Sequence, residues 1–145
     1  MNKTTSFSLI LLSLIGLVSC GGSDSDSEST SFELLSGAWQ VLEGDYLGEN
    51  YTFFDSEGTR TIYIYNEEQG CYTEQTPTYQ YTEHVNGNQF RPYRLANGSR
   101  KYLTNGYISV SEDGNILSSG GGWDADMQFL VSGLTLSYFT SNICI

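Results

Sequence analysis

Few side chains of this 145-residue chain could perform nucleophilic catalysis. A Ser or Cys nucleophile needs an imidazole beside it as general base, and the single imidazole of the sequence belongs to His84. His84 lies three residues before Gly87, the second residue of an Asn-Gly turn signal. This position predicts an exposed residue at the end of a strand, so we do not expect a catalytic triad.

Paired carboxylates offer a second kind of chemistry, because glycosidases use one as an acid and the other as a nucleophile or base. The pairs are Glu67 with Glu68, Glu112 with Asp113, and Asp124 with Asp126. Each pair falls in an expected turn or loop, where solvation by water is the simpler explanation for carboxylates. Hydrolysis of a glycan is therefore a less favoured alternative.

A metal or phosphate site finds little support in the sequence. Asp124 and Asp126 follow the glycines 120–122 and could offer oxygens to Ca²⁺, but the spaced ligands and closing Glu of an EF-hand are missing. The phosphate-binding pattern G-x-x-x-x-G-K is also missing. We expect no enzyme activity, no metal and no cofactor.

Aromatic residues are the remaining chemical feature. Eleven tyrosines occur, and the alternation of strands places Tyr63 with Tyr65 on one face and Tyr79 with Tyr81 on another. Trp123 follows three glycines. These five residues could line a cavity or form a platform for a sugar, since their rings are apolar with a polar group. Alternatively, the tyrosines fill a twisted sheet and its cross-strand pairs.

The segment before Cys20 has the parts of a secretory signal. Lys3 precedes an apolar run from Phe7 to Val18, which is too short to cross a bilayer as a helix. The residues Leu17-Val18-Ser19-Cys20 resemble the lipobox of bacterial lipoproteins. The resemblance implies cleavage of residues 1–19 and lipidation of Cys20, which would anchor the chain to a membrane without a transmembrane helix.

Residues 20–31 read as a solvated tether, because this acidic, Ser- and Gly-rich stretch has no large apolar side chain. In lipoproteins an Asp after the lipidated cysteine favours the inner membrane, so Gly21 implies the outer membrane. The acidic tether also resembles the surface-export signal of Bacteroidetes lipoproteins. Both the cell surface and the periplasmic face remain open, with the surface slightly favoured.

Two cysteines remain once Cys20 is lipidated. Cys71 and Cys144 would then lie in an oxidising compartment, where a disulfide persists, so we expect them to pair. Such a bridge is worth about 2–4 kcal/mol. The lone His84 does not complete a zinc site with them in any usual spacing.

The charge of the mature chain is strongly acidic. Loss of Lys3 leaves five basic residues beside 17 acidic ones, so nucleic acid is not an expected partner. Between Glu83 and Glu112 there is no carboxylate, and four of the five cations lie there: Arg91, Arg94, Arg100 and Lys101. This basic segment is either a solvated part of the sheet or a surface that faces an anion.

The fold expected for residues 32–145 is a single all-β domain. Short runs of β-branched and aromatic residues alternate with Gly, Asn and Asp turn signals. The expected strands are residues 38–43, 49–55, 60–66, 71–81, 89–95, 101–111, 115–118 and 129–140. Asn86-Gly87, Asn97-Gly98 and Asp113-Gly114 suit tight hairpin turns. The strands therefore predict an antiparallel meander.

About eight such strands would close into a barrel, which leaves no exposed edge. Trp39 and Val41 share one face of the first strand, and Leu134, Leu136 and Tyr138 share one face of the last. Pro92 lacks an N–H, so its strand should carry a bulge or border an opening. A two-sheet β-sandwich is the alternative fold.

The segment Leu35-Ser36-Gly37-Ala38-Trp39-Gln40-Val41 resembles the G-x-W opening of lipocalin-like domains. It follows the tether, as in the small lipocalin-like lipoproteins of Bacteroidetes, and residues 127–137 resemble their closing strand. The resemblance implies that Gly37 and Trp39 pack across one end of the barrel.

Together these observations predict a membrane-anchored, lipocalin-like lipoprotein that binds a small apolar or amphipathic ligand. The alternative is an interaction module that contacts a protein or a glycan with its outer surface and holds no internal ligand. The oligomeric state is not predicted.

Overall fold

Antiparallel strands make up most of the computed structural model, which describes residues 32–42, 50–121 and 127–145. The described strands are β1 (Gly37–Val41), β2 (Tyr51–Phe54), β3 (Arg60–Asn66), β4 (Cys71–Gln75), β5 (Tyr81–Asn86), β6 (Gln89–Ala96), β7 (Ser99–Tyr102), β8 (Tyr107–Val110), β9 (Ile116–Gly120) and β10 (Gln128–Ser132). One short helix, α1 (Leu136–Ser141), follows them. The expected tether and signal segment lie outside the described residues.

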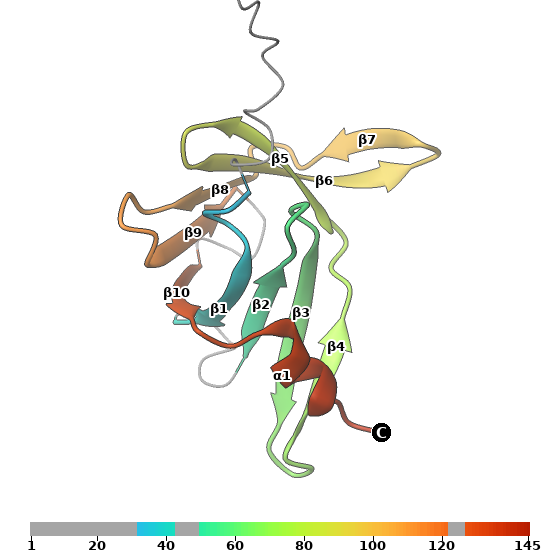
Figure 1. Cartoon of the computed structure of the whole chain (residues 1–145). Coiled ribbons are helices and arrows are strands. Elements are labelled where there is room, and N and C mark those ends of the chain that lie inside the picture. The colour runs from blue at the N-terminus through green and yellow to red at the C-terminus, as the bar shows by residue number, and fades with distance from the viewer. Residues whose placement is uncertain (1–31, 43–49, 122–126) are drawn as a thin grey trace, which may run out of the picture.

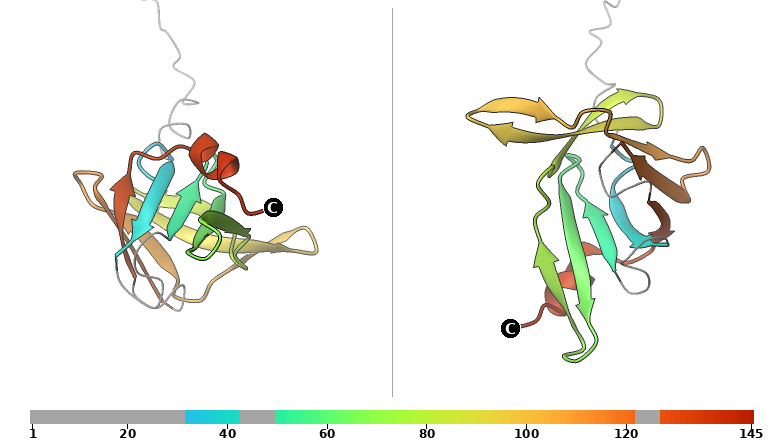
Figure 2. Two further views of the ribbon diagram at one scale, coloured as in Figure 1. Left: turned by 90° about the horizontal axis from the view of Figure 1, so that it is seen from below. Right: turned by 180° about the vertical axis from the view of Figure 1, so that it is seen from behind.

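A single curled sheet contains all of these strands, in the order β4-β3-β2-β1-β10-β9-β8-β6-β5, with β7 paired to β6. The first strand pairs with the last, since Trp39 of β1 lies opposite Val131 of β10. The sheet curls into a half-barrel (Figures 1 and 2), and an isolated bridge joins Thr59, just before β3, to Tyr81 at the start of β5. The predicted all-β fold, a curled antiparallel meander, is confirmed.

Two predicted strands were too long, and the structure has ten described strands where about eight were expected. The run 101–111 is divided between β7 and β8, and β5 was not predicted beyond its first residue, Tyr81. The expected strand 71–81 ends at Gln75, just before the segment that holds Pro77, and a separate strand begins at Tyr81. The expected strand 101–111 is interrupted at Asn105, whose φ of 59° is incompatible with a strand. A proline and a positive φ thus break the two runs.

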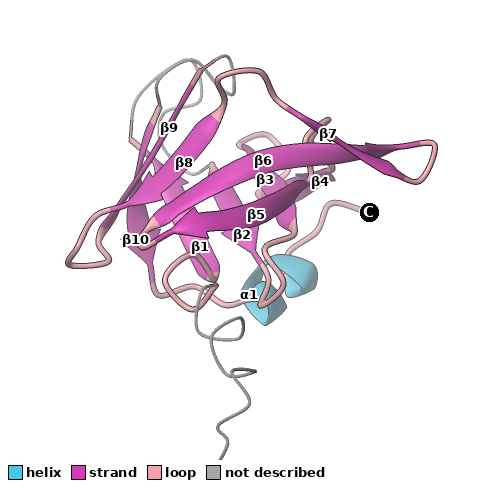
Figure 3. Cartoon of the chain, turned by 90° about the horizontal axis from the view of Figure 1, so that it is seen from above, coloured by secondary structure: helices cyan, strands magenta, loops and turns pink. Residues whose placement is uncertain are grey.

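Pro92 lies at an opening in the sheet. Before it, Gln89 and Phe90 pair with β8, and after it, Tyr93 to Ala96 pair with β7. The missing N–H of Pro92 therefore falls where β6 exchanges one neighbour for another. The β5–β6–β7 layer extends from this point, and the β6–β7 hairpin projects beyond the rest of the sheet (Figure 3).

The predicted last strand, residues 129–140, was wrong in its second half. β10 ends at Ser132, and Leu136–Ser141 form α1, in which Phe139 is fully buried. Leu136 and Tyr138 are more than 40% exposed, so the expected shared face of Leu134, Leu136 and Tyr138 does not exist. A six-residue helix is too short for helical periodicity to be recognised in the sequence.

Apolar side chains pack on both faces of the sheet. The concave cluster fills the inside of the curl and contains Leu35, Trp39, Val41, Phe54, Phe90, Ile108, Val110, Leu117, Met127 and Phe129. The convex cluster lies under α1 and contains Ala38, Tyr63, Tyr72 and Phe139, with Tyr51, Phe53, Tyr65, Leu134 and Ile143 beside them. The helix therefore covers the outer face of β1 to β4.

The predicted disulfide joins Cys71 and Cys144, with Cα atoms 5.1 Å apart. It fixes the C-terminal segment along β4, where Ile143 forms a parallel bridge with Tyr72. The N–H of Cys144 also donates to the carbonyl of Tyr72 at 2.9 Å. The disulfide thus holds the segment after α1 against the edge strand β4, and this segment covers the edge. Within the described ranges, no helix is both long and apolar enough to cross a bilayer.

Candidate functional site

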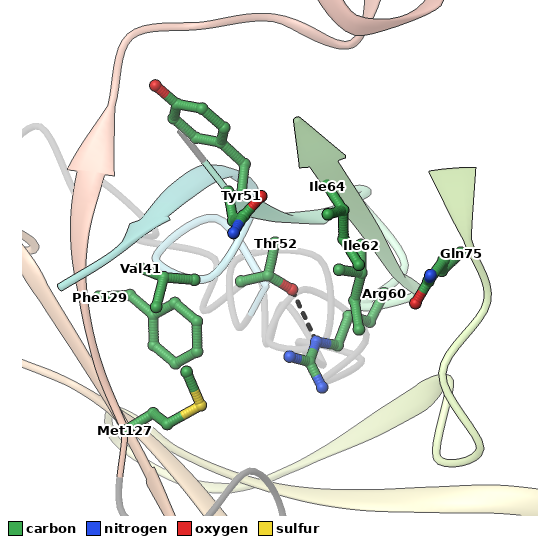
Figure 4. A pocket seen from close by; sticks show the side chains of 10 residues that line it. Val41, Tyr51, Thr52, Arg60, Ile62, Ile64, Gln75, Met127 and Phe129 are labelled. Carbon is green, nitrogen blue, oxygen red and sulfur yellow. Dashed lines mark hydrogen bonds between the residues drawn. The ribbon is translucent and has the colours of Figure 1, made fainter. Parts of the chain in front are cut away.

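A cavity of about 100 Å³ opens on the concave face, between β1, β2, β3 and the strand β10. Figure 4 shows Val41, Phe129 and Met127 on one side and Ile62, Ile64 and Gln75 on the other. Asn50, Tyr51, Thr52 and Arg60 complete the lining. The walls are thus mainly apolar with a few polar groups, which is the usual character of a small-molecule site.

Arg60 brings a positive charge into this cavity. Its side chain is only 3% exposed, and its Nε donates a hydrogen bond to the Thr52 hydroxyl oxygen at 2.6 Å. Burial of a guanidinium costs several kcal/mol unless hydrogen bonds or opposite charge compensate it. Among the described residues that line the cavity, Arg60 is the one charged side chain, so it is the one that could give the cavity a preference for an anion.

The alternation of β3 explains why Arg60 points inward. Arg60, Ile62 and Ile64 occupy every second position and all line the cavity, whereas Tyr63 between them is buried in the convex cluster. Arg60 was not among the site residues predicted from the sequence. The available signal was that, apart from Lys3, it is the one cation outside the basic segment, and that it begins an alternating apolar run.

The four tyrosines predicted to contact a ligand do not lie together. Tyr63 and Tyr65 share a face, as expected, but this face is the convex one beneath α1 and not the cavity. Tyr79 packs against the concave cluster, while the Tyr81 ring stacks on that of Tyr93 at 5.5 Å. These four tyrosines therefore do not line one cavity, because Tyr63 and Tyr65 face the convex side of the sheet and Tyr79 packs on the concave side.

The pKa of Tyr63 is raised, first because burial disfavours the phenolate and then because the nearby Glu74 carboxylate repels it. The Tyr63 hydroxyl donates to Glu74 Oε2 at 3.5 Å. This environment keeps Tyr63 neutral. A packing role for Tyr63 fits these contacts.

Gly37 and Trp39 stand at the beginning of β1. Trp39 is 1% exposed within the concave cluster, and its indole N–H donates to the Leu35 carbonyl at 2.8 Å. Gly37 has a φ of +123°, a conformation that residues with a Cβ rarely adopt. The G-x-W segment therefore turns the chain into β1 and places the tryptophan in the interior.

The remaining predicted positions do not form a catalytic group where the structure describes them. His84 contacts the carbonyl of Gly87 through Nε2 at 2.9 Å. Asp113 accepts hydrogen bonds from Ser111 and Asn115, which lower the pKa of its carboxyl and stabilise a turn. The described residues contain no group of three or more His, Cys, Asp or Glu that could hold a metal ion. Cys20, Trp123, Asp124 and Asp126 lie outside the described residues.

A second hollow, of about 400 Å³, lies on the convex side between β2 and the residues that lead into α1. Phe53, Phe54, Leu134 and Leu136 contribute to it, together with Asp55. The Asp55 carboxylate already accepts hydrogen bonds from the N–H groups of Glu57 and Thr59. The lining of this hollow is therefore mainly apolar, and its carboxylate already stabilises a turn. The cavity at Arg60 is the better candidate site.

Comparisons with protein-family models, with curated proteins and with solved structures give no match.

Proposed function

We propose that this chain is a lipid-anchored binding protein that holds a small amphipathic anion in the concave cavity. The acidic group of the ligand would meet Arg60, and its apolar part would contact Ile62, Ile64 and Phe129. The observation that carries this proposal is a buried guanidinium in a mainly apolar cavity. Arginine suits the role because its planar N–H groups match the geometry of a carboxylate.

The volume of the cavity limits the ligand. Typical ligand pockets measure about 300–1,000 Å³, and a dry cavity of about 150 Å³ accepts benzene. About 100 Å³ is therefore enough for a short carboxylic acid or for the acidic end of a longer molecule. A bulky ligand such as a polycyclic lipid does not fit this space.

The proposed anchor is Cys20, because Leu17-Val18-Ser19-Cys20 and Gly21 together resemble a lipobox. Two or more acyl chains contribute roughly 0.8 kcal/mol per buried CH₂, which is enough for lasting attachment. We place the protein at the outer membrane, with the cell surface favoured over the periplasmic face. The proposed role is binding and not catalysis.

Ligand binding can be tested with matched acids and alcohols. Hexanoate and hexanol have the same apolar chain, so a site built around Arg60 should bind the acid at least tenfold more tightly, as a charged hydrogen bond is worth about 1.5–3 kcal/mol. NMR titration should shift the methyl resonances of Ile62, Ile64 and Met127. The probe is the mature chain with Cys20→Ser, which lacks the acyl chains.

Two variants make this test specific. Arg60→Met keeps the length of the side chain but removes the charge, so it should abolish the preference for the acid. Arg94→Met removes an exposed arginine outside the cavity and should leave the preference unchanged. Equal shifts with acid and alcohol, or no shifts with either at millimolar concentration, would refute the proposal. Thermal unfolding of each variant shows whether the fold is retained.

The anchor has an independent test. Replacing Cys20 with Ser in the expressed full-length chain should give an uncleaved or soluble form, and the mass of the mature protein should lose its acyl groups. Protease treatment of intact cells then distinguishes the surface from the periplasmic face. Unchanged membrane partition together with unchanged mass would contradict lipidation at Cys20.

A further inference from the structure

The convex face of the β5–β6–β7 layer carries a group of aromatic and basic side chains. In β6, Phe90 and Pro92 are buried on the concave side, so Arg91, Tyr93 and Leu95 point the opposite way. Residues directly across an antiparallel pair share a face, and this rule adds Tyr81, Glu83, Arg100 and Tyr102. We call these seven residues the outer platform. Figure 3 shows this layer from above.

Contacts between aromatic rings and guanidinium groups fix the side chains of the outer platform relative to one another. The Tyr93 ring lies between those of Tyr81 and Tyr102, with centroid distances of 5.5 and 5.7 Å. The Arg91 guanidinium lies 4.4 Å from the centre of the Tyr102 ring, and that of Arg100 lies 4.9 Å from the centre of the Tyr93 ring. Such cation–π contacts restrict the two arginines, and Arg100 also donates a hydrogen bond to the Glu83 carboxylate.

Positive charge on this layer is only partly neutralised. Arg100 pairs with Glu83 at 2.5 Å, and both side chains are more than a third exposed. Arg91, Arg94 and Lys101 form no ion pair with another described residue. Arg94 and Lys101 lie opposite each other on the reverse face of the β6–β7 hairpin. The hairpin therefore has a local positive charge in a chain whose net charge is strongly negative.

The N-terminal segment joins the domain at the same strands. Phe32, the first described residue, stacks on Phe90 of β6 with ring centroids 5.9 Å apart. Phe90 faces the concave side of β6, so this contact lies on the face opposite to the outer platform. Twelve extended residues, the number from Cys20 to Ser31, span at most about 40 Å. A lipid on Cys20 would therefore hold the domain within that distance of the membrane.

We infer that the outer platform rests on a membrane surface and binds the phosphate groups of anionic phospholipids. This inference rests on the proposed anchor at Cys20. Arginine forms bidentate hydrogen bonds with phosphate, and tyrosine is enriched at the level of lipid headgroups. Leu95, which is 53% exposed near the tip of the hairpin, would enter the interface between headgroups and acyl chains. Charge complementarity and aromatic content thus favour the same surface.

The contact need not be strong to orient the domain. A short flexible tether gives an effective concentration in the millimolar range, so a weak surface interaction is sufficient once the acyl chains are inserted. Each Lys or Arg near an anionic bilayer strengthens binding by about fivefold. The interaction should weaken at high salt, because the screening length falls from about 10 Å at 0.1 M to about 3 Å at 1 M.

The test uses the mature chain with Cys20→Ser, so that acyl chains do not contribute. This protein includes all the residues that the structure describes. Sedimentation of vesicles measures the fraction of the protein that binds to them. Vesicles with 30% phosphatidylglycerol in phosphatidylcholine should bind it at low salt, and pure phosphatidylcholine should bind at least tenfold less. The Arg91→Gln/Arg100→Gln variant should bind the anionic vesicles about tenfold less tightly, or more weakly still.

Arg94→Gln/Lys101→Gln is the matched control, because it removes the same charge from the reverse face. Its binding to the anionic vesicles should weaken by no more than about threefold. Equal losses of vesicle binding in the two variants would overturn the inference that the outer platform contacts the membrane. Such a result would indicate a general effect of positive charge. Absence of binding to anionic vesicles would also overturn it, and so would binding to polygalacturonate alone, which would indicate an acidic glycan. Failure here leaves lipidation of Cys20 intact, since that is read from mass.

Discussion

The ring of Phe139 in α1 lies parallel to the ring of Tyr63 in β3, with centroids 4.4 Å apart and an angle of 7° between the planes. Both side chains are almost fully buried. This stack attaches the C-terminal helix to the convex face of the sheet. Tyr72 and Tyr51 pack their rings around Phe139 at 5.3 Å, so Phe139 is the buried aromatic contact of α1 with the sheet.

Replacing Phe139 with Ala should lower the free energy of unfolding by about 3–5 kcal/mol, because it leaves a cavity among aromatic rings. Denaturant unfolding followed by circular dichroism measures the change. Ser137→Ala, at an exposed position of the same helix, should change it by less than about 0.5 kcal/mol. Similar small effects in both variants would show that α1 does not contribute to stability.

Loss of the disulfide should destabilise the domain by about 2–4 kcal/mol, since the bridge closes a long loop in the unfolded chain. The two cysteines are 73 residues apart in sequence. The experiment compares guanidinium unfolding of the wild type with that of Cys71→Ser/Cys144→Ser. Reductant should shift the wild-type midpoint to that of the variant. A midpoint independent of reductant would contradict the prediction.

Stability at alkaline pH should depend on Tyr63. Burial and Glu74 raise the pKa of Tyr63 above its ordinary value of 10.0, so the neutral phenol is favoured in the folded state. This contribution is fully present below pH 10 and is lost as the pH rises through the raised pKa. Unfolding free energies measured between about pH 9 and pH 12 should fall more steeply for the wild type than for Tyr63→Phe. Identical slopes would refute the assignment.

Gly58→Ala should be more destabilising than Gly114→Ala. The two glycines have similar φ values, 76° and 72°, so the cost of backbone strain is matched. A Cβ on Gly58 would collide with the Phe32 ring and the Thr82 hydroxyl, whereas a Cβ on Gly114 meets nothing within 4 Å. We expect a loss of about 1 kcal/mol for Gly114→Ala and at least twice that for Gly58→Ala. Thermal unfolding measures both, and equal losses would argue against close packing at Phe32.

Much of the sheet could be predicted because its strands are bounded by strong turn signals. β3 was predicted with its observed bounds, and the hairpins at Asn97-Gly98 and Asp113-Gly114 occur where expected. α1 could not be predicted, because Leu134, Leu136 and Tyr138 alternate as in a strand. Its formation depends on Phe139 finding a place beside Tyr63, and this is a tertiary contact.

The candidate site was harder to predict, because both faces of β3 are apolar. Ile62 and Ile64 alternate with Tyr63 and Tyr65, so the period of two does not reveal which pair faces the concave side. The tyrosines were predicted as ligand contacts because they are numerous, but the residues of β3 that line the cavity are Arg60 and the two isoleucines. Which face turns inward depends on the curl of the whole sheet, and no local pattern encodes it.

Pairing of β1 with β10 has a consequence for how the domain folds. Ala38 and Ser132 are register partners, although most of the domain separates them in sequence. Contacts between such distant segments form slowly, because the entropy of closing the intervening loop must be overcome first. The domain therefore cannot complete its core until residue 132 is available to the chain. A nascent chain that is shorter than this leaves one edge of β1 unpaired, and such an edge is a template for aggregation.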